Sequence, residues 1–144
     1  MSDIWYTLAF KYSRDEMIYD LHGLWPEACC VEVNEVQGLF KIEELDVKLY
    51  VKLERVWNSD NHPPLRHEND EEVELKADIK FWEHEWNRHG RYSGLSMNAY
   101  FEKALSLYDK YKSMLPKCNE NHQCHVYLDK DYEMIDSDIV KKGL

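Results

Sequence analysis

Large apolar side chains occupy every second position near the start of the chain, and this alternation is the strongest constraint on its fold. The residues in this pattern are Ile4, Tyr6, Leu8, Phe10 and Tyr12. Because successive side chains of a strand point to opposite faces, these five share one face of a predicted strand over residues 4–12. Residues 18–23 predict a second short strand, with a turn at 14–17 before it and Gly23 at its end.

The middle of the chain favours helices. Residues 39–57 fit a helical face and a strand equally well, and their leucine, lysine and glutamate content favours a helix. Residues 58–74 form a polar segment that contains two prolines and predicts a loop. Residues 77–89 then predict a second helix, which ends at Gly90 because glycine is the usual residue after a helix C-terminus.

A further helix is predicted between Ser96, whose side chain can cap it, and Pro116, which cannot continue it. Its inner face consists of residues at helical spacing: Met97, Tyr100, Phe101, Ala104, Tyr108, Tyr111 and Leu115. Residues 124–136 predict two short strands around a turn at 129–131. The chain has no repeats and no break in composition, so we expect a single domain over residues 1–144.

Composition and charge limit the possible partners. The chain has 144 residues, of which 44% are hydrophobic, and a net charge of −10. The charge argues against long-range attraction to a polyanion, so any nucleic-acid contact must come from a local basic pocket. A plain alternative is a soluble acidic protein with an uncharged or cationic partner. No apolar run is long enough to span a bilayer and no export signal is visible, which favours a cytoplasmic protein, including a viral protein in a host cell.

Four cysteines, Cys29, Cys30, Cys118 and Cys124, allow three pairings that the sequence does not distinguish. Free thiols are expected in the absence of an export signal. The segment CNENHQCH at 118–125 also suggests a metal clip, but its spacing matches no strong zinc pattern. A small disulfide between Cys118 and Cys124, or free thiols, fits this segment better.

The stretch FWEHEWNRHG at 81–90 combines groups that suit phosphate-ester chemistry. At about 100° per residue, five of its side chains share an arc of roughly 140° on the predicted helix. They are Phe81, His84, Glu85, Arg88 and His89. An imidazole moves protons near neutral pH, a guanidinium binds phosphate oxygens, and a carboxylate orients an imidazole. A salt-bridged surface is the alternative. Zinc is disfavoured, because His84 and His89 are one residue too far apart for a metalloprotease helix.

The earlier stretch LHGLWPE at 21–27 supplies a second proton carrier, His22, followed by a rigid aromatic segment at Trp25–Pro26. Internal cleavage of RNA needs a base for the 2′-hydroxyl and an acid for the leaving 5′-oxygen, and two histidines on opposite sides of a phosphate provide both. A tryptophan beside that phosphate can stack on a base. A core histidine near a tight turn is the alternative.

HGLWP followed by FWEHEWNRHG resembles the two active-site segments of the ribonuclease T2 family. The resemblance implies an α+β fold, with a central antiparallel β-sheet packed against several α-helices, and no metal or cofactor. It implies an endoribonuclease that cleaves single-stranded RNA through a 2′,3′-cyclic phosphate, with low base specificity and often best at acidic pH. RNA is then the expected partner of a monomer, with neither DNA nor a membrane.

The resemblance also implies a role for each catalytic residue by its motif position. His89 would be the general base on the 2′-hydroxyl, and His22 would be the general acid on the leaving oxygen. Glu85 and Arg88 would stabilise the pentacoordinate phosphorane, and His84 would hold the phosphate.

Three further residues would contact the substrate: Trp25 and Glu27 at the base on the 5′ side of the cut, and Phe81 at the following base. The chain departs from the family pattern in three ways. Arg88 stands where the family usually has lysine, no cysteine follows the HG of the second segment, and the C-terminal half is short. These departures leave open a catalytically weak relative that binds RNA or nucleotides as a binding module.

Overall fold

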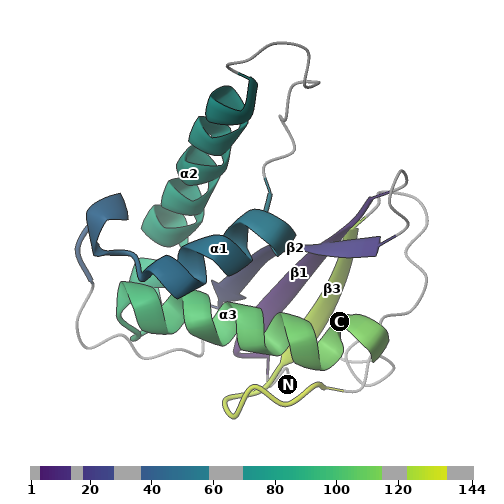
Figure 1. Ribbon diagram of the computed structural model, residues 1–144. Coiled ribbons are helices and arrows are strands. Elements are labelled where there is room, and N and C mark those ends of the chain that lie inside the picture. The colour runs from purple at the N-terminus through teal and green to yellow at the C-terminus, as the bar shows by residue number, and fades with distance from the viewer. Residues whose placement is uncertain (1–3, 14–17, 28–36, 59–69, 115–122, 136–144) are drawn as a thin grey trace.

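The computed structural model describes residues 4–13, 18–27, 37–58, 70–114 and 123–135. These residues form an α+β fold with three strands and three α-helices (Figure 1). The strands are β1 (Tyr6–Ser13), β2 (Ile18–Pro26) and β3 (Gln123–Leu128). The helices are α1 (Val47–Val56), α2 (Asp70–Arg88) and α3 (Met97–Tyr111), with single 3₁₀ turns at Ile42–Glu44, Gly90–Tyr92 and Lys112–Met114.

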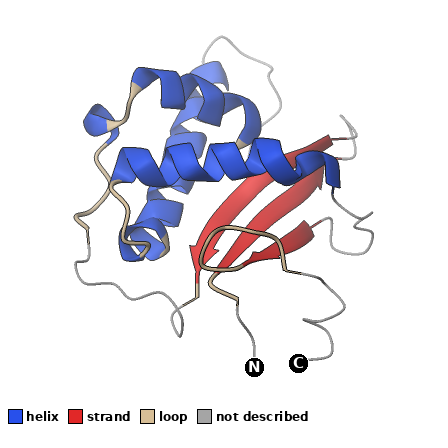
Figure 2. Cartoon of the chain, turned by 90° about the horizontal axis from the view of Figure 1, so that it is seen from below, coloured by secondary structure: helices blue, strands red, loops and turns tan. Residues whose placement is uncertain are grey.

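The sheet is antiparallel, in the order β2-β1-β3, and the alternation of β1 decides which of its side chains face the helices. Tyr6, Leu8 and Phe10 are all buried, as their spacing predicts. Figure 2 shows the helices gathered on one side of the chain and the strands on the other. The intervening residues Thr7 and Ala9 therefore belong to the opposite face of the sheet.

β2 is longer than the sequence predicts, because Gly23 does not end it. The strand continues to Pro26, and Gly23 pairs with Ala9 of β1. The register slips by one residue beside this pair, since the next partner of β1, Phe10, is Leu21. His22 is thus the extra residue of a β-bulge. It lies within the strand and not at its end.

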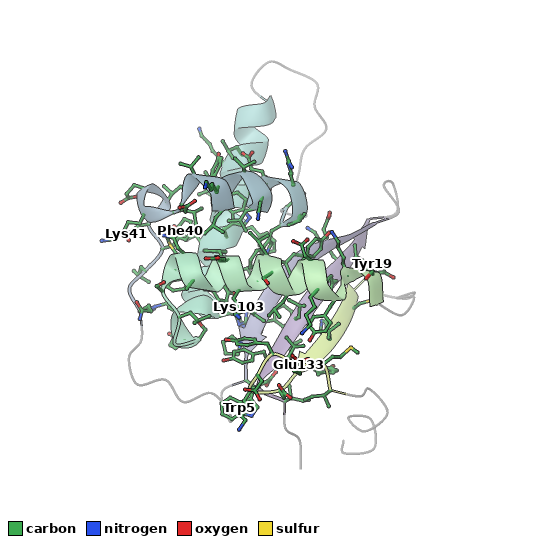
Figure 3. All side chains as sticks on the ribbon, turned by 60° about the horizontal axis from the view of Figure 1, so that its bottom comes forward. Trp5, Tyr19, Phe40, Lys41, Lys103 and Glu133 are labelled. Carbon is green, nitrogen blue, oxygen red and sulfur yellow. The ribbon has the colours of Figure 1, made fainter. Side chains whose placement is uncertain are left out.

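α3 follows the predicted pattern and holds the sheet through tyrosine hydroxyls. The side chain of Ser96 caps it by accepting from the backbone N–H of Ala99 at 3.3 Å. Tyr100 donates its hydroxyl to the carbonyl of Leu24 at 2.7 Å, and Tyr108 donates to that of Tyr19 at 2.7 Å. Figure 3 shows Tyr19 beside the C-terminal end of α3. Both bonds fix β2 against the helix from the buried side.

The remaining residues of the predicted inner face have three outcomes. Phe101, Ala104 and Tyr111 are buried, Met97 is half-buried, and Leu115 lies outside the described residues. α3 itself ends at Tyr111, before the predicted limit at Pro116, because its last turn tightens into a 3₁₀ turn.

Both other predicted helices have shifted boundaries. The helix expected over 39–57 is broken, because Asp46 is extended and its side chain caps α1 by accepting from the backbone N–H of Lys48 at 2.8 Å. α2 begins at Asp70, within the predicted loop 58–74. Residues 70–76 are rich in good helix formers with acidic residues first, which suits a helix N-terminus.

After β3 the chain makes a tight turn and not a second full strand. An isolated bridge joins Leu128 to Met134, and the side chain of Asp129 accepts from the backbone N–H of Asp131 at 2.8 Å. Cys124 is disulfide-bonded, so the free-thiol expectation is wrong for this residue. The other three cysteines lie outside the described residues. No helix in the part of the chain that the structure describes is both long and apolar enough to cross a membrane.

Candidate active site

The β-bulge of β2 places His22 beside the helices. Bulges redirect a side chain by interrupting the strand alternation, and they are common next to active sites. Two tryptophan side chains support the backbone around His22 through two linked hydrogen bonds. Trp57 donates its indole N–H to the carbonyl of His22 at 3.0 Å, and Trp82 of α2 donates to the carbonyl of Trp57 at 2.6 Å. Both indoles are fully buried, so this support is rigid.

The C-terminal half of α2 brings the second motif to His22. Trp82 and Trp86 are buried and anchor this part of the helix in the core. The ring centroid of Phe81 lies 5.6 Å from that of His22. Glu83, which lies outside the predicted arc of site residues, is exposed. Asn87 contacts the segment before the 3₁₀ turn Ile42–Glu44, because its side-chain oxygen accepts from the backbone N–H of Phe40 at 3.0 Å.

Trp25 connects the two motifs. Its indole N–H donates to Oε1 of Glu85 at 3.0 Å, and its ring stacks on the imidazole of His89 with centroids 5.3 Å apart. The centroid of His22 lies 5.8 Å from the same indole, on its edge. The other carboxylate oxygen of Glu85 is 3.8 Å from Nε2 of His89. Both candidate proton carriers therefore meet at one indole, and His89 also lies beside the carboxyl group of Glu85.

Burial shifts the pKa values of both Glu85 and His89 away from their ordinary values. Glu85 is only 3% exposed. Burial raises the pKa of this carboxyl to about 7, against the lowering effects of the Trp25 hydrogen bond and the Arg88 charge. Burial also lowers the pKa of His89 to about 4, assisted by the charges of Arg88, His84 and His22. Between these two values, both groups are uncharged in the folded protein.

Gly23 is required by the contact between Trp25 and Glu85. A Cβ on Gly23 would lie 2.2 Å from Oε1 of Glu85 and 2.2 Å from Nε1 of Trp25, the two atoms of that hydrogen bond. A side chain at position 23 would thus occupy the place of the bond. This close approach explains the glycine of HGLWP better than the predicted strand end does.

We expect Gly23→Ala to displace Trp25 or Glu85 and to lower the free energy of unfolding by about 1–3 kcal/mol, the usual cost of overpacking. Gly38→Ala is the matched control, because a Cβ there meets nothing within 4 Å. Urea unfolding of both variants measures the difference. Equal stability of the two variants would contradict the close approach at Gly23.

The remaining motif residues lie around this centre. His84 and Arg88 are exposed on α2, and their charges reach His89. Glu27 directly follows β2, and its Oε1 accepts from the hydroxyl of Thr7 at 3.0 Å. The structure therefore brings His22, Trp25, Phe81, Glu85 and His89 together, and it leaves Glu27 at the end of the strand.

One residue near the site belongs to a segment for which the sequence suggests a different role. His125 of β3 lies in the segment considered for a metal clip, yet its ring centroid is 5.4 Å from that of Trp25, at an edge. The alternation of β3 carries the missing signal: Cys124, Val126 and Leu128 are buried, which sends His125 to the opposite face. Among the described residues, no three His, Cys, Asp or Glu side chains are grouped to hold a metal ion. Of the CNENHQCH segment, Gln123, Cys124 and His125 are among the described residues, and residues 118–122 lie outside them.

Comparison with known proteins decides which family carries this arrangement. The family model described as Ribonuclease T2 family matches residues 6–133, which is most of the chain. The chain belongs to the ribonuclease T2 family. No curated protein and no solved structure matches it. Membership of the family supports an endoribonuclease with RNA as its substrate, and the α+β fold agrees with this assignment.

Proposed function

We propose that this ribonuclease T2 family member cleaves single-stranded RNA by transphosphorylation, in which the 2′-oxygen attacks the adjacent phosphorus and the 5′-oxygen leaves. The product is a 2′,3′-cyclic phosphate. The observation that carries the proposal is the meeting of His22 and His89 at one indole, with ring centroids 5.8 and 5.3 Å from that of Trp25. Two imidazoles at one site supply the base and the acid that this reaction needs.

His89 has the properties of the base in this reaction. Its pKa is lowered to about 4, so the imidazole is uncharged at mildly acidic pH and can take the proton of the 2′-hydroxyl. His22 is the acid that donates a proton to the leaving 5′-oxygen. Its place on the bulge, beside Phe81, sets it at a different element from His89. One group on a strand and one directly after a helix can face a phosphate from two sides.

Glu85 and Arg88 stabilise the pentacoordinate phosphorane. With its pKa raised to about 7, Glu85 is protonated at acidic pH, and its O–H can donate to a phosphoryl oxygen as negative charge develops there. Arg88 and His84 are exposed on the same helix, where they can reach phosphate oxygens from solvent. Arginine can contact two oxygens at once, whereas lysine acts as a point charge.

The substrate bases extend to both sides of this centre. Trp25 and Glu27 bind the base on the 5′ side of the cut, and Phe81 borders the following base. In support, all three are partly accessible. Because the Glu27 carboxyl is oriented by Thr7, it can accept from an exocyclic amine. This arrangement mildly favours adenine or cytosine at the 5′ position, without strict base specificity.

Incubation of the protein with a fluorescently labelled single-stranded RNA at pH 5 tests the proposal. We expect fragments that end in 2′,3′-cyclic phosphate, and the same reaction on a 2′-deoxy strand should give none because the nucleophile is missing. A folded protein that binds the RNA without cutting it at any pH from 4 to 8 would instead support the binding module.

We expect the cleavage rate to follow a bell-shaped curve between the two shifted pKa values. The rate should rise as pH increases through about 4, because His89 loses the proton that prevents it from acting as a base. It should fall as pH increases through about 7, because Glu85 ionises and no longer donates to the phosphoryl oxygen. Initial rates on one dinucleotide across pH 3–9 measure both limbs. A rate that still climbs above pH 8 would contradict the assigned role of Glu85.

A further inference from the structure

The indole of Trp25 is occupied by protein contacts that base binding does not require. Its N–H donates to Oε1 of Glu85 at 3.0 Å. One face of the ring stacks on His89, with the two planes 29° apart. A ring in an offset stack of this kind restricts the orientation of its neighbour. One side chain of β2 thus contacts Glu85 in the last turn of α2 and His89 directly after the helix.

The surroundings of Trp25 keep the indole in this place. Because Gly23 has no side chain, there is space for the contact between the indole N–H of Trp25 and the carboxyl oxygen of Glu85. On the sheet, Trp25 pairs with Thr7 of β1, whose side chain is buried. His125 approaches the indole edge from β3, with planes 84° apart. The ring is therefore held from the sheet on one side, and it holds the helix residues on the other.

We propose that Trp25 is a positioning residue: its indole N–H fixes the Glu85 carboxyl and its ring face fixes the His89 imidazole in the geometry that cleavage needs. This inference rests on the proposed function for its catalytic consequence. It goes beyond the base-binding role of Trp25, because the two roles make different predictions. A residue that only binds the base changes KM, whereas a positioning residue changes kcat.

Trp25→Phe separates the two contacts, because phenylalanine keeps a ring beside His89 but has no N–H for Glu85. We expect kcat on RNA to fall by about 10- to 100-fold, since small displacements of a catalytic group cost up to about 100-fold in rate. KM should change by less than about threefold. Because the hydrogen bond from Trp25 lowers the pKa of Glu85, its loss should move the alkaline limb of the rate profile to higher pH.

The control is Trp5→Phe, which also removes an indole. Trp5 is half-buried and precedes β1, at the end of the molecule where Glu133 also lies (Figure 3). We expect this variant to keep the wild-type rate and pH profile. If Trp25→Phe raised KM, left kcat unchanged and kept the wild-type alkaline limb, the positioning role would be refuted and base binding supported.

A second measurement keeps the inference separate from the proposed function. NMR titration of the His89 ring protons requires no activity. In the wild type the stacked indole should shift these protons upfield, and Trp25→Leu should remove the shift. If the wild type cleaves RNA but the His89 resonances are the same in both proteins, the positioning role fails alone. If the upfield shift is present and RNA is not cleaved, the proposed function fails alone.

Discussion

His89→Ala is expected to lower the rate of RNA cleavage by about 10²–10⁴-fold, the usual contribution of a positioned general base. His22→Ala should cause a loss of similar size, because the leaving 5′-alkoxide is a poor leaving group without a proton. The fold should persist in both variants, since neither imidazole belongs to the buried core. Initial rates at pH 5 measure the loss, with Glu83→Ala on the exposed side of α2 as a control of unchanged rate.

A substrate with a better leaving group distinguishes the two histidines. Uridine 3′-(p-nitrophenyl phosphate) releases nitrophenolate, which leaves without protonation. The loss in His22→Ala should therefore be much smaller on this ester than on RNA. His89→Ala should lose activity on both substrates to a similar degree, because attack by the 2′-oxygen still needs a base. The reverse pattern would exchange the assigned roles, and full activity of either variant on RNA would remove that residue from the mechanism.

Local pattern was sufficient to predict the elements that carry the site. The alternation in β1 and the capping serine of α3 are decided by neighbours in the sequence, and the structure confirms both. The two motifs could be recognised because their residue types are chemically distinctive. Even the split of residues 39–57 has a local signal, since Asp46 is a good N-terminal cap followed by apolar residues at helical spacing.

The relation between the motifs could not be predicted from local pattern. The bulge at His22 depends on the register between β1 and β2, and strand periodicity alone gives no register. For the same reason, the sequence predicts a strand end at Gly23, whereas this glycine makes room for a bond between Trp25 and Glu85. The proximity of His125 to Trp25 depends on β3 pairing with β1, which joins the two ends of the chain.

Replacing Glu85 with glutamine should have two opposite effects, a loss of activity and a gain of stability. The folded protein holds the Glu85 proton up to about pH 7, whereas the unfolded chain releases it near the ordinary value of 4.5. The folded state therefore binds more protons between these values, and stability falls as pH rises through them. Because one pKa unit corresponds to about 1.4 kcal/mol, the cost above pH 7 is on the order of 3 kcal/mol.

Glutamine removes this cost, because its amide does not ionise and its oxygen can still accept from Trp25. We expect Glu85→Gln to be more stable than the wild type by about 1–3 kcal/mol at pH 8 and equal to it near pH 4. Urea unfolding at both pH values measures the difference. Glu83→Gln is the matched control: it removes a carboxylate two residues away, on the exposed side of the helix, and should show no such pH dependence.

The same substitution tests the catalytic role of the carboxyl group. The amide N–H of glutamine is a weaker donor than the O–H of a carboxylic acid, so it should stabilise the developing phosphorane charge less. We expect kcat to fall, by up to the roughly 10²–10³-fold that loss of such a donor costs. The alkaline limb of the rate profile should also change in Glu85→Gln, because one of the groups that must keep its proton for the reaction is gone. A variant that is active but no more stable at pH 8 would show that Glu85 is neither buried at a cost nor needed for the reaction. If Glu85 is kept uncharged for catalysis, its replacement should raise the stability of the protein and lower its activity. Burial of this carboxyl group costs the folded protein stability, and only the reaction benefits from it.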